Sequence, residues 1–361
     1  ISKLNIRSSV KKTWDIIRKI SGKNSSLPLP YILDHSKTLI KEPEETSNVL
    51  GQEFAKNSSS NHYSESFQHF KARIEQKTLN FNSNNRETYN DLFNMNELKE
   101  ALRRANDTAT GPDEIHYQFL KHLPDKTIEL LLDIINDIWQ SGQLPSTWKE
   151  ATIIPIPKPN KDHQQPSNYR PIALTSCLCK TMERMINNRL VWFLEYNGFI
   201  AKAQSGFRKQ RSTQDHLVRM ETFIRDGFIR GDHVVSVFFD LEKAYDTTWK
   251  YGIMRDLHEL GLRGRLPIFI QNFLSDRMFK VRVGSTYSNH YPQEMGVPQG
   301  CILSVTLFSV KINNIANIQS PDTDTTLFVD DLSISYRSKN MRSIERHMQL
   351  TLNKVQDFTD K

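Results

Sequence analysis

Apolar residues recur along this chain with two spacings, one typical of helices and one of strands, from about residue 91 onward. Apolar positions three and four residues apart predict amphipathic helices. These helices are expected at residues 97–105, 126–140, 180–197, 213–227, 248–260, 302–318 and 343–358. Runs rich in β-branched and aromatic residues predict strands at 151–157, 234–239, 279–283, 325–329 and 332–336. The pattern predicts a domain in which helices and strands are mixed.

Two strand regions have features that restrict their pairing. The region 151–157 contains Pro155 and Pro157, so an edge strand or one arm of a hairpin is expected there. The alternating residues 279–283 predict a hairpin with a partner near Tyr291.

Residues 1–90 differ from the rest and are expected to form an upstream connector that is disordered in part. Residues 14–20 have the spacing of a short amphipathic helix. The Ser/Asn-rich stretches at 57–61 and 80–85 offer little apolar surface to bury, which is typical of mobile segments. The chain starts with Ile1 rather than Met, so we expect it to be a fragment of a longer protein.

Acidic residues stand at the ends of predicted strands. Asp240 ends the run 234–239, and the pair Asp330 and Asp331 separates two later runs. A β-hairpin with this pair at its turn is the simplest arrangement, and parallel pairing is the alternative. Converging carboxylates repel unless a cation neutralises them, and two Mg²⁺ ions held in this way form a phosphoryl-transfer site. Alone, the pair Asp330 and Asp331 is more typical of a turn, and Asp240 is typical of a strand end, so the hypothesis depends on the combination.

The loop Gly296-Val297-Pro298-Gln299-Gly300-Cys301 lies between these aspartates and opens a predicted helix. Glycine lets a backbone approach a flat base closely, and Gln299 offers a donor and an acceptor. A plain connection between a hairpin and a helix is the structural alternative.

Composition adds two restrictions. The net charge of +7 and the pI of about 9.1 favour polyanionic partners, although a well-solvated basic surface has the same composition. The three cysteines, Cys177, Cys179 and Cys301, are too few and unevenly spaced for a disulfide framework or a zinc site. No stretch of membrane-spanning length and no signal peptide is recognised, so no membrane partner is expected.

The order and spacing of several motifs resemble those of reverse transcriptases, most of all those of non-LTR (LINE-type) retrotransposons similar to jockey. The motifs are Gly111-Pro112-Asp113, Tyr169-Arg170-Pro171-Ile172, Phe238-Phe239-Asp240, Tyr245-Asp246, Gly296–Gly300 and Phe328-Val329-Asp330-Asp331. The resemblance implies an α+β, right-hand polymerase fold with an antiparallel palm sheet and packed helices. It implies fingers at 91–230, palm at 231–342, and the truncated start of the last palm helix at 343–361, with the thumb missing.

The resemblance also implies site residues. Asp240, Asp330 and Asp331 would be catalytic and would hold two Mg²⁺ ions, with Mn²⁺ able to substitute. Nucleotide binding would fall to residues of the fingers, the strand ends and the glycine loop, namely Lys158, Arg170, Leu241, Tyr245, Gln299 and Gly300. Tyr245 would act as a steric gate against a ribose 2′-hydroxyl, with a plain core aromatic as the alternative. Gly206, Arg208 and Val329 would contact template or primer.

The implied activity is RNA-directed DNA synthesis by extension of a DNA 3′ end. The implied partners are an RNA template, a DNA primer, deoxynucleoside triphosphates and the rest of a retrotransposon polyprotein, with an upstream endonuclease and a downstream thumb. An intracellular location is expected, nuclear for target-site synthesis and cytoplasmic as a ribonucleoprotein. A catalytically incompetent RNA-binding remnant and a group II intron-type maturase are the alternatives.

Overall fold

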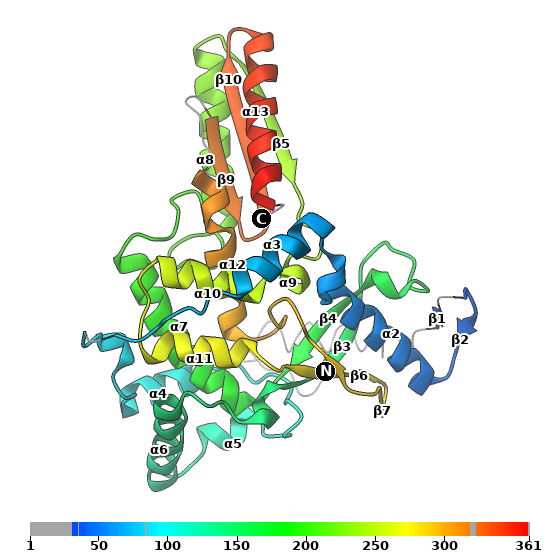
Figure 1. The fold of residues 1–361 in the computed structure, drawn as a ribbon, viewed down its shortest axis with the longest axis vertical. Coiled ribbons are helices and arrows are strands. Elements are labelled where there is room, and N and C mark those ends of the chain that lie inside the picture. The colour runs from blue at the N-terminus through cyan, green and yellow to red at the C-terminus, as the bar shows by residue number, and fades with distance from the viewer. Residues whose placement is uncertain (1–30, 35, 84, 318–322, 360–361) are drawn as a thin grey trace, which may run out of the picture.

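The computed structural model describes residues 31–34, 36–83, 85–317 and 323–359. In Figure 1 its elements form a narrow upper part and a broad lower part. The upper part consists of α8 (Thr213–Ile229), β5 (His233–Phe239), β9 (Thr323–Phe328), β10 (Asp331–Ser338) and α13 (Met341–Thr359).

The upper sheet is antiparallel, with strand order β5–β10–β9. The hairpin expected around Asp330 is confirmed, because Asp331 pairs with Phe328 in antiparallel register. Successive side chains of a strand point to opposite faces. Leu332, Ile334 and Tyr336 accordingly belong to an apolar cluster with residues of α13, whereas the opposite face of the sheet meets α8. This sheet fixes the ends of β5 and β9 at the same edge, on the two sides of β10.

The lower sheet has the order β4–β3–β6–β7, in which β7 is Thr286–Tyr287, and β8 (Tyr291–Pro292) also pairs with β6. Strand β3 (Glu150–Pro157) forms a hairpin with β4 (Tyr169–Leu174) over most of its length. It pairs with β6 (Met278–Val283) only over Glu150–Ile153, so both prolines lie beyond this contact. The predicted hairpin is confirmed by the pairing of Phe279 with Tyr291.

The helices of the lower part share one apolar cluster with α7 (Cys177–Tyr196), which is the longest of the described helices. They are α4 (Met95–Arg103), α5 (Tyr117–Lys121), α6 (Asp125–Ser141), α10 (Lys250–Glu259), α11 (Arg265–Leu274) and α12 (Ile302–Ile312). Helix α11 was not predicted from the sequence, although Leu266, Phe269, Ile270 and Phe273 are buried at helical spacing. Pro267 is typical of a helix break and so argues against a helix here, but proline is tolerated in the first turn of a helix, where Pro267 lies.

The described part of the expected connector packs against the lower part. Helix α2 (Pro43–Asn57) places Leu50 and Phe54 in an apolar cluster with residues of β6. Helix α3 (Glu65–Glu75) places Phe67 against Trp249 with ring centroids 5.4 Å apart. Residues 43–75 are therefore folded, in contrast to the expected connector. The predicted helix at 14–20 lies outside the described residues, and the domain boundaries at 90, 230 and 342 stay predictions.

No helix among the described residues combines the length and the apolarity needed to cross a membrane. The expected mixture of helices with antiparallel sheets is confirmed.

Candidate active site

The structure brings the three predicted carboxylates to one end of the upper sheet. Asp240 follows Phe239, which pairs with Leu332, and continuation of this register places Asp240 beside Asp331. Asp330 occupies the turn that precedes β10. Burial raises the pKa of Asp330, and the negative charges of Asp331 and Asp240 raise it further. Asp240 and Asp331 are therefore close enough to Asp330 to affect it electrostatically.

The donor set suits a divalent cation in charge and chemistry. None of the ion pairs in the described part of the chain involves Asp240, Asp330 or Asp331, and carboxylate oxygens are the ligands that Mg²⁺ prefers. Across residues 31–34, 36–83, 85–317 and 323–359, no three or more His, Cys, Asp or Glu side chains are grouped so that they could hold a metal ion. The carboxylates thus have the chemical composition of a cation site, but their present arrangement does not enclose an ion.

Tyr245 lies on the short helix α9 (Ala244–Thr247), directly beyond the end of β5. Its ring stacks on Phe308 of α12, with centroids 4.7 Å apart and planes 17° apart. Burial and the nearby charge of Asp330 raise the pKa of Tyr245 to about 12, so the hydroxyl stays protonated at neutral pH. The ring is half-buried beside the carboxylates, and both its predicted role as a gate and a packing role are compatible with this position.

The glycine loop is fixed between β4 and α9. The Gln299 amide nitrogen donates to Asp246 Oδ1 at 2.9 Å, and the Gln299 carbonyl accepts from the Ala173 N–H at 2.7 Å. Gly300 has a φ of +129°, and a Cβ there would lie 2.4 Å from the Ala173 carbonyl oxygen. The loop therefore requires glycine at position 300, and Asp246 accepts a hydrogen bond from the Gln299 side chain.

Lys158 and Arg170 both belong to the β3–β4 hairpin region. The Lys158 ammonium donates to the Ser167 carbonyl at 3.1 Å. Burial raises the pKa of Asp246, and the positive charge of Lys158 partly offsets this rise. Arg170 is exposed and forms no ion pair within the described residues. The structure thus places Lys158 toward the glycine loop and leaves Arg170 accessible.

Arg208 has a different environment from the one expected for a template contact. Its guanidinium binds both carboxylate oxygens of Glu195, at 2.8 and 2.5 Å, and donates to the carbonyls of Ala201 and Gln204. Its side chain is only 15% exposed. Arg208 therefore fastens the 201–208 segment to α7, and its contact with template stays a prediction.

Gly206 and Val329 are in direct contact. A Cβ at Gly206 would lie 2.5 Å from both the backbone nitrogen and a methyl carbon of Val329. The Gln204 side chain also contacts Val329 through hydrogen bonds. Sequence reasoning did not assign Gln204 a role in the acidic turn, because the two segments are more than 120 residues apart.

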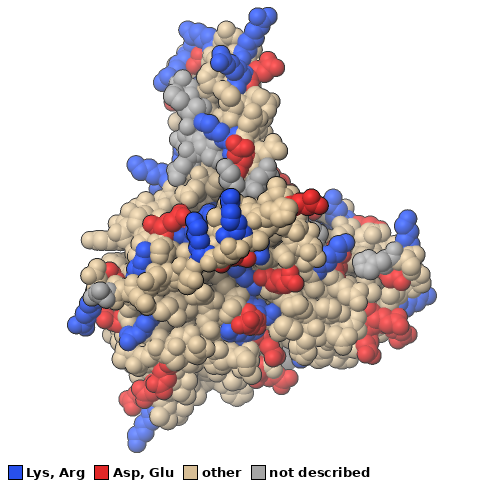
Figure 2. All heavy atoms as spheres, viewed as in Figure 1, with Lys and Arg blue, Asp and Glu red and all other residues tan. Residues whose placement is uncertain are grey.

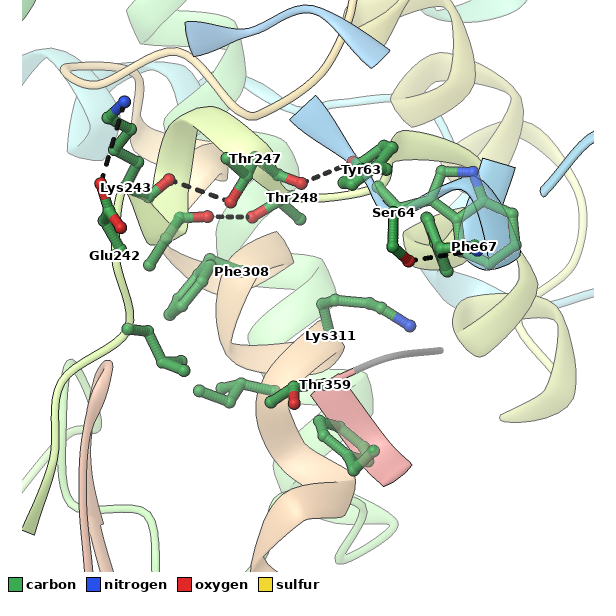
Figure 3. Close-up of a pocket in the computed structure, with 15 residues that line it drawn as sticks. Tyr63, Ser64, Phe67, Glu242, Lys243, Thr247, Thr248, Phe308, Lys311 and Thr359 are labelled. Carbon is green, nitrogen blue, oxygen red and sulfur yellow. Dashed lines mark hydrogen bonds and ion pairs between the residues drawn. The ribbon is translucent and has the colours of Figure 1, made fainter. Parts of the chain in front are cut away.

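Leu241 lines a cavity of about 480 Å³ together with residues of α9. Figure 3 shows this cavity. The cavity walls come from the upstream segment, the α9 turn, α12 and the end of α13, and include Tyr63, Phe67, Lys243, Thr247, Phe308, Lys311 and Phe358. The Tyr63 hydroxyl donates to the Thr247 carbonyl at 2.6 Å, and the Lys243 ammonium donates to Asn57 at 2.8 Å. These upstream contacts with the turn that carries Tyr245 were not predicted from the sequence.

Basic side chains are prominent on the surface of the upper part. Figure 2 shows Lys and Arg side chains at its free end. Arg230 at the end of α8, Lys339 after β10 and Arg342 on α13 are exposed. A surface of this charge is compatible with a polyanionic partner.

The comparison with protein families identifies the chain. The model for reverse transcriptase (RNA-dependent DNA polymerase) matches residues 156–361, which include all of the predicted site residues. The chain therefore belongs to the reverse transcriptase family. This family has the polymerase fold with palm and fingers, and its members use divalent metal ions.

Curated relatives include three proteins of Drosophila melanogaster. The chain is 30% identical over 258 residues to the RNA-directed DNA polymerase from mobile element jockey, covering 70% of this chain and 28% of the relative. It is 30% identical over 296 residues to the probable RNA-directed DNA polymerase from transposon X-element, covering 77% and 32%. It is 31% identical over 262 residues to the probable RNA-directed DNA polymerase from transposon BS, covering 71% and 29%. The chain thus spans less than a third of the length of these relatives.

Proposed function

We propose that this chain carries the polymerase centre of an RNA-directed DNA polymerase from a non-LTR retrotransposon, which extends a DNA 3′ end on an RNA template. The observation that carries this proposal is the convergence of Asp240 and Asp330 at adjacent strand ends, beside Tyr245 and the Gln299 loop. The activity named for the relatives from jockey, X-element and BS supports the same function.

In this proposal the sheet β5–β10–β9 is the palm and the β3–β4 hairpin belongs to the fingers. The thumb would lie downstream in the polyprotein and an endonuclease upstream. The partners would be an RNA template, a DNA primer and deoxynucleoside triphosphates. Synthesis would take place in the nucleus at the target site, and the cytoplasmic form would be a ribonucleoprotein.

Asp240 and Asp330 would hold two Mg²⁺ ions, with Asp331 assisting and Mn²⁺ able to substitute. Such ions supply activation of the primer 3′-hydroxyl and neutralisation of the leaving pyrophosphate. The exposed Arg170 guanidinium suits forked contacts with the triphosphate, and Lys158 adds a point charge on the same hairpin.

The remaining candidates would shape the nucleotide and primer sites. The Tyr245 ring, fixed by Phe308, would collide with a ribose 2′-hydroxyl and so exclude ribonucleotides. Gln299 and Gly300 would frame the base from a loop that hydrogen bonds hold in place, with Leu241 beside it. Val329 would lie under the primer end, directly before Asp330.

Primer extension by the purified protein tests the proposal. Asp240→Asn and Asp330→Asn remove one negative charge without changing the size of the side chain. We expect kcat to fall by about 10²–10³-fold or more, the scale on which loss of one electrostatic group acts. The matched control is Asp133→Asn on an exposed face of α6, which should leave kcat unchanged. Binding of template–primer should persist in all three variants.

Three outcomes contradict the proposal in different ways. Full extension by Asp330→Asn would exclude the carboxylates as the catalytic centre. A wild-type protein that binds template–primer without extending it would be an RNA-binding remnant. If Tyr245→Val discriminated between deoxynucleotides and ribonucleotides as well as the wild type does, only the proposed gate role of Tyr245 would be excluded.

A further inference from the structure

Val329, the residue directly before Asp330, has an unusual backbone conformation. Val329 has a φ of +62° and is only 7% exposed. It is the single β-branched residue among the described non-glycine residues with positive φ. A β-branched residue in the left-handed region is strained, and such strain persists only where surrounding contacts enforce it. The turn that presents Asp330 therefore needs a local restraint.

Gln204 supplies contacts with both polar groups of Val329. Its side-chain oxygen accepts from the Val329 N–H at 3.0 Å, and its side-chain nitrogen donates to the Val329 carbonyl at 3.4 Å. The same oxygen accepts from the Gly206 N–H at 2.8 Å. The residue is 1% exposed, so its amide faces protein rather than solvent.

The segment around Gln204 is itself held rigidly along β9. The Ser205 N–H donates to the Leu327 carbonyl at 2.9 Å, and the Leu327 N–H donates to the Ala203 carbonyl at 3.0 Å. Gly206 has no room for a Cβ against Val329, and Arg208 ties the segment to α7. The residues on both sides of Gln204, Ala203 and Ser205, are thus hydrogen-bonded to β9, which fixes the position of Gln204 beside the acidic turn.

We propose that Gln204 is a positioning residue, which holds Val329 in the left-handed conformation and thereby directs the Asp330 carboxylate toward Asp240. This inference rests on the proposed polymerase function. Without the amide, Val329 relaxes toward negative φ, and a change of φ at one residue redirects the side chain that follows it. The buried amide has its partners within the protein, so the role does not require contact with template.

The test combines kinetics with hydrogen exchange in the purified protein. Gln204→Met keeps the length of the side chain and removes its acceptor and donor. We expect kcat for primer extension to fall by about 10- to 100-fold, the effect of a misplaced catalytic group, with KM for the nucleotide within about twofold. The Val329 amide should exchange at least about tenfold faster, because it loses its acceptor. Gln349→Met, on an exposed face of α13, is the control and should change neither quantity.

A second substitution separates this role from general packing. Glycine adopts positive φ without steric cost, so Val329→Gly should make the enzyme less dependent on Gln204. We expect the kcat loss caused by Gln204→Met to be about tenfold smaller in the Val329→Gly background, a non-additive effect typical of residues in contact. Equal losses in both backgrounds would overturn the inference, as would an unchanged exchange rate at Val329.

Two further controls keep the outcome interpretable. Gln204→Asn retains an amide but shortens its reach, and it replaces the methionine variant if that variant does not fold. If the wild-type protein binds template–primer without extending it, the proposed function fails. The Val329 exchange rates then still decide whether Gln204 holds the turn.

Discussion

The hydrogen bond between Asp246 and Gln299 gives a quantitative test of how the nucleotide site is held. The Gln299 amide donates to the Asp246 carboxylate at 2.9 Å. A hydrogen bond to a charged group contributes about 1.5–3 kcal/mol. Asp246→Leu removes this acceptor at similar size. If Gln299 must be fixed to frame a nucleotide, kcat/KM for the nucleotide should fall by about 10- to 150-fold, since 1.36 kcal/mol corresponds to a factor of ten.

Single-nucleotide incorporation at varied nucleotide concentration measures this effect. Asp246→Asn keeps an acceptor but loses the charge, so it should retain more activity than Asp246→Leu. Asp133→Leu, at an exposed position on α6, controls for the loss of one carboxylate. The reasoning is refuted if Asp246→Leu leaves kcat/KM for the nucleotide unchanged, because Gln299 would then need no anchor.

Two further predictions concern pH and backbone strain. Burial and the nearby charge of Arg277 lower the pKa of Lys250 to about 7. Between pH 7 and 10.5 the unfolded state therefore binds more protons than the folded state, and the free energy of unfolding should rise with pH in this window. Urea unfolding at pH 6 and 9 should show a gain in stability of at most about 3 kcal/mol in the wild type, because about two pH units of this window lie below pH 9, and a smaller gain in Lys250→Met; equal gains would contradict the prediction. Gly300→Ala should destabilise the protein by about 1–3 kcal/mol and abolish extension, because it adds a clash to an unfavourable φ. Gly231→Ala, with a φ of +71° and open space around it, measures the conformational cost alone, so equal losses in the two variants would exclude the clash.

The sequence predicted the regular elements better than the contacts between them. Helix α6 and strand β5 were predicted within a residue or two, because periodicity is a local property. The acidic hairpin was also predicted, since the strand runs on both sides of Asp330 are strong. Helix α11 was missed because Pro267 resembles a helix breaker in a one-dimensional pattern. The packing of α2 and α3 was missed because the surrounding Ser/Asn-rich sequence has the composition of a disordered segment.

Side-chain roles in the site were harder to predict for a different reason. The sequence marked Arg208 as a basic residue, but its carboxylate partner, Glu195, is visible only in the fold. Likewise, Gln204 carries no charge and stands far from the aspartates in sequence, so no local pattern connects it with Val329. Chemistry at a single position can be predicted from residue type, whereas the partners that restrain a side chain depend on tertiary structure.

The residues proposed to act on substrate stand mostly in turns, where no ladder of backbone hydrogen bonds sets their direction. Each turn is instead restrained from a remote segment: Val329 by Gln204, and the α9 turn by Tyr63 through the Thr247 carbonyl. Such restraints fix the backbone without occupying the space a substrate needs. The same arrangement leaves the Asp330 carboxylate free of ion pairs within the described residues, and burial together with the charges of Asp331 and Asp240 raises its pKa. A divalent cation bound at this turn would relieve the repulsion among the carboxylates, and it would also attract the negatively charged triphosphate.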